Sequence, residues 1–192
     1  MGMDALALVE VNSVARGYRV VDALVKKAPV VVLEANLVEP GLYLVLFCGG
    51  VAEVQMSHAE ALEIAGDMLV DEMLLPRVHG DLLAGLRGAV DCTDPDTVGI
   101  IEGGRVSSTL EACDWALKEA DVTLAGLRIT PALGGKAYFV VQGLQHDVEA
   151  ALEAASGILQ GRGALVHAEL IPRPHAEFLA HVLRPAPFSL EN

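Results

Sequence analysis

Basic and aromatic residues are scarce in this 192-residue chain. Lysine and arginine together number 13 against 26 acidic residues, which gives a formal net charge of −13, and aromatic residues make up only 4%. No cluster of Lys and Arg interleaves with aromatic side chains, as is typical of surfaces that bind nucleic acid. The composition therefore argues against nucleic acid as a partner.

Cysteine is also scarce, with three residues in the chain. Cys48, Cys92 and Cys113 are an odd number and lack the CxxC spacing of zinc sites, so neither a disulfide framework nor a zinc site is expected. We predict reduced thiols, of which at least two pack as small hydrophobic side chains. The cysteines therefore indicate no metal and no cofactor.

Long hydrophobic runs are missing, although the chain is apolar overall. Hydrophobic residues make up 53% and the mean hydropathy is +0.44, yet runs such as Leu42 to Cys48 are far shorter than a membrane span. The N-terminus has no basic segment, and Glu10 interrupts the apolar stretch that a signal peptide would need. We therefore expect no membrane partner, a cytoplasmic location, and apolar surface that is buried between subunits.

What the sequence does contain is an internal repeat. Asp22 and Lys26 recur 92 residues later as Asp114 and Lys118. Two small insertions in the second half then increase the shift to 94 and finally to 96. At the largest shift, Pro76-Arg77-Val78-His79 matches Pro172-Arg173-Pro174-His175. The chain therefore consists of two copies of one structural unit.

The hydrophobic pattern of each copy predicts alternating strands and helices. In the first copy a helix follows the N-cap Ser13 and ends before Pro29. In the second copy, Ser108-Thr109-Leu110-Glu111 is predicted to be the capping box that opens the corresponding helix. The predicted strands of the first copy are Ala5–Val11, Val30–Val38, Leu42–Cys48 and Leu69–Leu75. The apolar face of its first helix consists of Val14, Tyr18, Val21, Val25 and Ala28, and that of its second helix of Val54, His58, Ala61, Leu62 and Ala65. The short third helix contains Leu82, Leu83 and Leu86.

The order of elements is β-α-β-β-α-β followed by a short helix. This is the split-βαβ, ferredoxin-like arrangement of the α+β class, an antiparallel sheet with helices on one face. Turn-forming residues between Arg87 and Thr97 indicate the boundary between the copies. We therefore predict two tandem domains at residues 1–90 and 96–184, with a C-terminal tail at residues 185–192.

Recognisable motifs for catalysis are missing from the sequence. No Gly-x-Ser-x-Gly elbow is present, and Gly103-Gly104 lacks the remaining glycines of a nucleotide-binding loop. His79 and His175 repeat, but no Asp, Glu or Cys stands at ligand spacing, so we interpret them as packing or hydrogen-bonding residues at helix starts. We predict no catalytic, cofactor-binding or metal-binding residue, and no enzymatic activity.

Three motifs together resemble the bacterial microcompartment (BMC) shell domain, over nearly the whole chain. They are Asp22-Ala23-Leu24-Val25-Lys26-Lys27-Ala28, Gly134-Gly135-Lys136-Ala137-Tyr138 and Ile171-Pro172-Arg173-Pro174-His175, in that family's order and approximate spacing. Two unpermuted domains are similar to the tandem shell protein of the propanediol-utilisation type. The resemblance implies a homotrimer that forms a pseudohexameric disc with a central pore for small metabolites. It also implies tiling with other shell proteins around encapsulated enzymes.

The resemblance assigns roles to particular residues. The loops between the second and third strands of each copy line the pore, and the basic residues that recur in both copies lie at the edge where discs meet. A guanidinium group suits pairing with backbone carbonyls across a close interface. The implied pore-lining residues are Val38, Glu39, Pro40, Gly41, Ala132, Leu133 and Gly134, and the implied edge residues are Lys26, Lys118, Arg77 and Arg173.

Two other functions remain open at the level of sequence. The best-known unpermuted tandem relative holds an iron–sulfur cluster at its three-fold pore, with a cysteine directly before Pro-Gly. Here Glu39 stands at that position, and a carboxylate is a poor ligand for such a cluster. A metal-binding or electron-relay shell subunit is therefore one alternative. The other is a small enzyme or regulator on a duplicated ferredoxin-like fold, because a fold does not determine a function.

Overall fold

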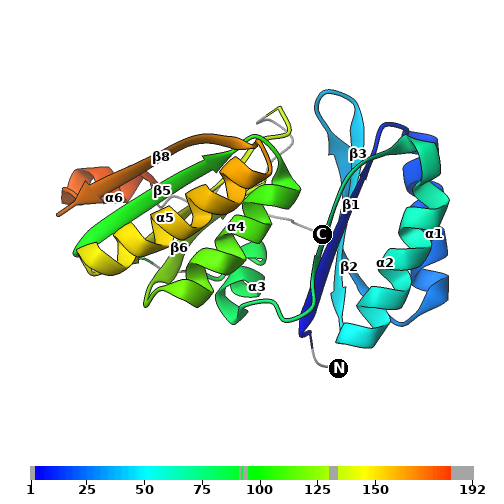
Figure 1. Ribbon diagram of the computed structural model, residues 1–192, viewed down its shortest axis with the longest axis horizontal. Coiled ribbons are helices and arrows are strands. Elements are labelled where there is room, and N and C mark those ends of the chain that lie inside the picture. The colour runs from blue at the N-terminus through cyan, green and yellow to red at the C-terminus, as the bar shows by residue number, and fades with distance from the viewer. Residues whose placement is uncertain (1–2, 91, 93–94, 130–133, 183–192) are drawn as a thin grey trace. The chain divides into compact units, whose positions relative to one another are not determined.

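The computed structural model describes residues 3–90, 92, 95–129 and 134–182. The chain divides into two compact units, Met1–Val78 and His79–Asn192 (Figure 1). Each unit contains one four-stranded antiparallel sheet. Within the described residues, no helix is both long enough and apolar enough to span a lipid bilayer.

The first unit has the order of elements that the sequence predicts. Its elements are β1 (Ala5–Val11), α1 (Val14–Lys27), β2 (Val31–Val38), β3 (Leu42–Gly49), α2 (Val51–Ala65), a 3-10 turn (Gly66–Met68) and β4 (Leu69–Leu75). The strands lie in the order β2-β3-β1-β4, and all the pairings are antiparallel. Helices α1 and α2 cover one face of the sheet (Figure 1). The predicted ferredoxin-like arrangement is confirmed.

The second unit repeats this arrangement. Its elements are α3 (Gly80–Leu86), β5 (Thr97–Gly103), α4 (Val106–Glu119), β6 (Thr123–Arg128), β7 (Ala137–Gly143), α5 (Gln145–Gly161), β8 (Leu165–Pro172) and α6 (Ala176–Val182). The strand order β6-β7-β5-β8 is the same as in the first unit. Helices α4 and α5 pack side by side on the sheet (Figure 1). The repeat seen in the sequence is therefore a repeat of the fold.

Helix α3 follows the first copy in the sequence but packs on the second unit. The sequence places it in a first domain at residues 1–90, whereas the first compact unit ends at Val78. The helix contacts β6 and α4. Gly85 permits this close packing, because a Cβ at that position would overlap the Leu124 side chain. Helix α3 is therefore structurally a part of the second unit.

The core of the first unit lies between the sheet and its two helices. Successive residues of a strand point to opposite faces of the sheet, so alternate residues of β1 such as Ala7 and Val9 face the helices. The buried stripe predicted for α2 is confirmed at Val54 and Ala61. Phe47 on β3 is completely buried, and burial of a side chain of this size stabilises the fold by about 2 to 3 kcal/mol.

The apolar face predicted for α1 is buried only in part, at Ala28 and at the half-buried Val21. Val14, Tyr18 and Val25 are exposed, and the helix instead buries the face that carries Gly17, Val20 and Leu24. Gly17 explains the difference, because the Tyr43 ring of β3 occupies the space that a Cβ at this position would need. The helix thus has two apolar faces, and the one with the larger side chains is not the one that packs on the sheet.

The predicted start of α4 is also wrong. The helix begins at Val106 with Arg105 as its N-cap, so Ser108-Thr109-Leu110-Glu111 is not a capping box. Ser108 and Thr109 lie inside the first turn and are buried, and their hydroxyl groups donate hydrogen bonds to the Arg105 carbonyl. The predicted N-cap Ser13 of α1 is confirmed, because its hydroxyl accepts a hydrogen bond from the Arg16 amide.

Candidate pore turns and edge residues

The turn between β2 and β3 holds four of the residues assigned to the pore. The Gly41 amide donates a hydrogen bond to the Val38 carbonyl over 3.0 Å, which closes the turn. Gly41 has a φ of 94°, a left-handed conformation that favours glycine. Glu39, Pro40 and Gly41 are exposed at the tip, whereas Val38 is only 7% exposed. The tip therefore presents a carboxylate to its surroundings.

The turn between β6 and β7 is the equivalent element of the second unit. Gly134 and Gly135 both have left-handed backbone conformations, with φ values of 62° and 82°. Gly134 is exposed. The assigned residues Ala132 and Leu133 lie outside the described residues. Of the three pore residues assigned to this turn, the structure therefore describes the small, uncharged Gly134.

Lys26 lies on the last turn of α1 and is strongly exposed. Its side-chain nitrogen lies 2.7 Å from a carboxylate oxygen of Asp22, one helical turn earlier, and the two side chains are 72% and 61% exposed. Water and salt screen an ion pair at such a surface, so the pair contributes at most about 1 kcal/mol to stability. The ammonium group remains accessible to other groups.

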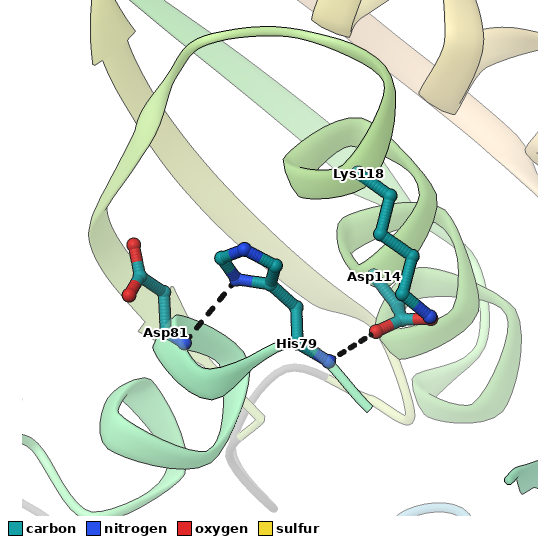
Figure 2. A network of polar contacts seen from close by, with 4 residues as sticks. All are labelled: His79, Asp81, Asp114 and Lys118. Carbon is teal, nitrogen blue, oxygen red and sulfur yellow. Dashed lines mark hydrogen bonds and ion pairs between the residues drawn. The ribbon is translucent and has the colours of Figure 1, made fainter. Parts of the chain in front are cut away.

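Lys118 occupies the equivalent position on α4 but has a different environment. Its partner Asp114 is almost fully buried, with 3% of its side chain exposed. The second carboxylate oxygen of Asp114 accepts a hydrogen bond of 2.7 Å from the backbone amide of His79, directly before α3 (Figure 2). Asp114 thus links α3 to α4. The repeated sequence pattern indicates this aspartate but not its role.

His79 and His175 start the two short helices, as the sequence predicts. The Nδ1 atom of His79 accepts a hydrogen bond from the Asp81 amide over 3.3 Å (Figure 2). The same atom of His175 accepts one from the Glu177 amide over 3.2 Å. A ring nitrogen that accepts from the first turn of a helix satisfies an amide that would otherwise lack a partner. The repeated histidines are therefore capping residues.

The two arginines assigned to the edge are exposed at the ends of β4 and β8. Arg77 follows β4, and Arg173 follows β8. Arg173 has a φ of 48°, which is uncommon for a residue with a side chain, and its amide donates a hydrogen bond of 2.8 Å to the Asp96 carbonyl. The backbone therefore fixes the direction in which the chain leaves β8.

Two of the three cysteines lie in packed elements, Cys48 on β3 and Cys113 on α4. Cys48 and Cys113 are buried, as predicted for at least two of the three. Burial raises the pKa of the Cys113 thiol, which keeps it protonated and unsuited to binding a metal. Among the residues that the structure describes, no group of three or more His, Cys, Asp or Glu side chains could hold a metal ion.

The comparison with protein families identifies the repeated unit. The BMC domain matches the chain twice, at residues 5–78 and 97–174. The chain belongs to the bacterial microcompartment shell protein family. Both matches contain the same order of strands and helices, and together they cover most of the chain. As a BMC shell protein the chain is a structural subunit of a microcompartment shell in the cytoplasm, and its relatives in this family are generally not enzymes.

Similar proteins support this placement of the BMC chain. The bacterial microcompartment shell protein PduT of Citrobacter freundii is 37% identical over 171 residues, which are 89% of this chain and 93% of PduT. The crystal structure of a microcompartment protein from Desulfitobacterium hafniense has a TM-score of 0.84 and 39% identity over 92% of this chain and 98% of that one. A fused permuted hexameric shell protein from the RMM microcompartment shares the fold, with a TM-score of 0.60 and 21% identity over 81% of each chain.

Proposed function

We propose that this BMC shell protein is a non-enzymatic tile that assembles as a homotrimer around a central pore. The observation that carries the proposal is the repeat of one fold within a single chain. Three copies supply six similar wedges, and six wedges close a ring with pseudo-six-fold symmetry. The tile joins other shell proteins, and small polar metabolites cross its pore towards encapsulated enzymes.

The assembly state is the first test of this proposal. We expect the purified protein to sediment as a single species of about three times its chain mass of 20.2 kDa, because exposed apolar residues on both units favour burial between chains. Analytical ultracentrifugation at micromolar concentration measures this directly. A stable monomer in that experiment would be incompatible with the tile.

The exposed turn at Glu39 supplies the charge of the proposed pore. Three-fold symmetry brings three copies of this turn together, with Glu39, Pro40 and Gly41 facing the opening and Val38 buried behind them. The equivalent turn of the second unit alternates with it, and its assigned pore residues Ala132, Leu133 and Gly134 carry no charge. A ring of carboxylates attracts cations and disfavours anions. The proposed pore therefore favours cations and neutral polar molecules.

Replacing Glu39 with glutamine should reduce the cation preference of the pore severalfold, and Glu39→Lys should reverse it. The reason is that three charges in a narrow opening act on every ion that passes. The reversal potential across a bilayer that contains the reconstituted trimer, measured in a salt gradient, reports this preference. The control is Glu53→Gln on α2. Equal selectivity for Glu39→Gln and Glu53→Gln would refute the acidic pore.

The metal-binding alternative finds no support in the described residues. Both buried cysteines lie within packed elements, Cys48 on β3 and Cys113 on α4, and neither is on a pore turn. The pore turn carries Glu39 where a cluster would need a thiolate. The proposal is therefore a pore for metabolites and not an electron relay.

A further inference from the structure

The first unit carries a partly exposed apolar face along α1 and β2. Tyr18 and Val25 on α1 are 65% and 44% exposed, and Asp22 lies between them on the same side of the helix. Next to α1, the edge strand β2 adds the half-buried Val32 and Ala35. We call this surface, made by Tyr18, Asp22, Val25, Val32 and Ala35, the α1/β2 face.

The same face of the second unit is buried. At a shift of 92 residues, Tyr18 and Val25 correspond to Leu110 and Leu117, which are 0% and 4% exposed. Asp22 corresponds to Asp114 at the same shift. The Asp114 side chain is 3% exposed, whereas the Asp22 side chain is 61% exposed. The strand residues correspond in the same way, to Leu124 and Leu127, which are 3% and 6% exposed. The two faces have equivalent positions in the fold and differ in what covers them.

Helix α3 packs on this face in the second unit. It contacts both α4 and β6, and its Gly85 lies directly against Leu124 and Leu127. The His79 amide donates a hydrogen bond to the buried carboxylate of Asp114 (Figure 2). The cover therefore consists of a seven-residue helix with a histidine in front of it.

The chain contains a second helix of this kind. Helix α6 also has seven residues and stands after β8 as α3 stands after β4. Its N-cap His175 makes the same ring-nitrogen hydrogen bond as His79. Leu82 and Leu83 of α3 correspond to the half-buried Phe178 and Leu179 of α6, and Leu179 packs here against Val98 and Val140 of its own sheet. Each chain thus has one α1/β2 face that α3 does not cover and one further helix of the covering type.

We propose that α6 of a second copy of this chain docks on the α1/β2 face. On docking, α6 leaves its contact with Val98 and Val140. The His175 amide then donates a hydrogen bond to Asp22 of the other copy, as the His79 amide does to Asp114, while Phe178 and Leu179 cover Tyr18 and Val25. Each chain offers a helix from its second unit and a face on its first unit, so the copies join head to tail and close a ring. The proposal rests on the homotrimer of the proposed function and names its docking contact.

Cysteine cross-linking tests the contact. In a background with Cys92→Ser and Cys113→Ala, one protein carries Asp22→Cys and another carries His175→Cys, and the two are mixed, allowed to exchange subunits and oxidised. We expect a covalent dimer on a non-reducing gel as the dominant product. The reason is that the equivalent contact between α3 and α4 holds residues 79 and 114 within hydrogen-bonding distance. The matched control is His79→Cys with Asp114→Cys in one chain, which should form an intrachain bond.

The outcomes separate the proposal from its alternatives. A cross-link within a chain that carries both Asp22→Cys and His175→Cys, with none in the mixture, would show that α6 folds back on its own chain. No cross-link in either, while the control pair reacts and sedimentation still gives a trimer, would overturn the docking and leave the trimer standing. A monomer in sedimentation would remove both.

A charge placed on the face gives an independent test. Val25→Glu should weaken self-association at least tenfold in sedimentation equilibrium, because it buries a carboxylate against α6. Ala23→Glu is the matched control on the same helix, since its counterpart Trp115 remains 44% exposed in the covered second unit. Circular dichroism should show both variants folded. Equal association of Val25→Glu and the wild type would contradict the docking.

Discussion

Replacing Asp114 with alanine should lower the free energy of unfolding by about 2 kcal/mol, because the change leaves the partly buried His79 amide without its acceptor. The carboxylate is almost fully buried and binds both the His79 amide and the Lys118 side chain. Lys118 is 38% exposed and can recover part of its hydration, so the amide accounts for most of the loss. Denaturant unfolding followed by circular dichroism measures the effect.

Two further variants identify the origin of this loss. Asp114→Asn retains an acceptor for the His79 amide but removes the charge that faces Lys118, so we expect it to lose less stability than Asp114→Ala. Glu102→Ala breaks the surface ion pair with Lys136 in the same unit, where both side chains are more than a third exposed, and should lower stability by less than about 1 kcal/mol. A loss in Asp114→Ala no greater than in Glu102→Ala would mean that the link between α3 and α4 is not important for stability.

Reversing the charge of Lys26 should abolish extended sheets while the trimer remains. Like charges placed across a close interface oppose association, and an effect of about 1.4 kcal/mol already raises the concentration needed for assembly tenfold. Lys118 requires a milder change to Gln, because an aspartate there would face the buried Asp114 and destabilise the fold itself. Electron microscopy of Lys26→Asp with Lys118→Gln, together with sedimentation, provides the measurement.

The matched control for the edge is Lys27→Asp, one position further along α1. Lys27 is 44% exposed and pairs with Glu60 of α2, so the control has the same charge change on the same helix. We expect it to form sheets as the wild type does. Normal sheets from the Lys26 variant, or loss of its trimer, would contradict the assignment of Lys26 to the edge between tiles. Arg77 and Arg173 share this proposed edge role.

The repeat and the order of elements could be predicted because both depend on local patterns. Strand and helix periodicities depend on neighbouring residues, so β1, α2 and the hairpin around Glu39 and Gly41 were found close to their true positions. The burial of at least two cysteines followed from their residue type, and the structure shows that these are Cys48 and Cys113. The helix-capping role of His79 was predicted from its place between a strand and a helix.

The sequence by itself determined two copies of a ferredoxin-like unit, and only the tertiary structure decided what packs on each copy. Asp22 and Asp114 stand in the same motif at the same place in their helices, yet one is exposed and the other buried. Periodicity could not show which apolar face of α1 packs on the sheet. That depends on the close contact between Gly17 and the Tyr43 ring of β3, which is distant in the sequence. It also could not show that α3 packs on β6 and α4. Burial depends on contacts between residues distant in sequence, and a local pattern contains no information about them.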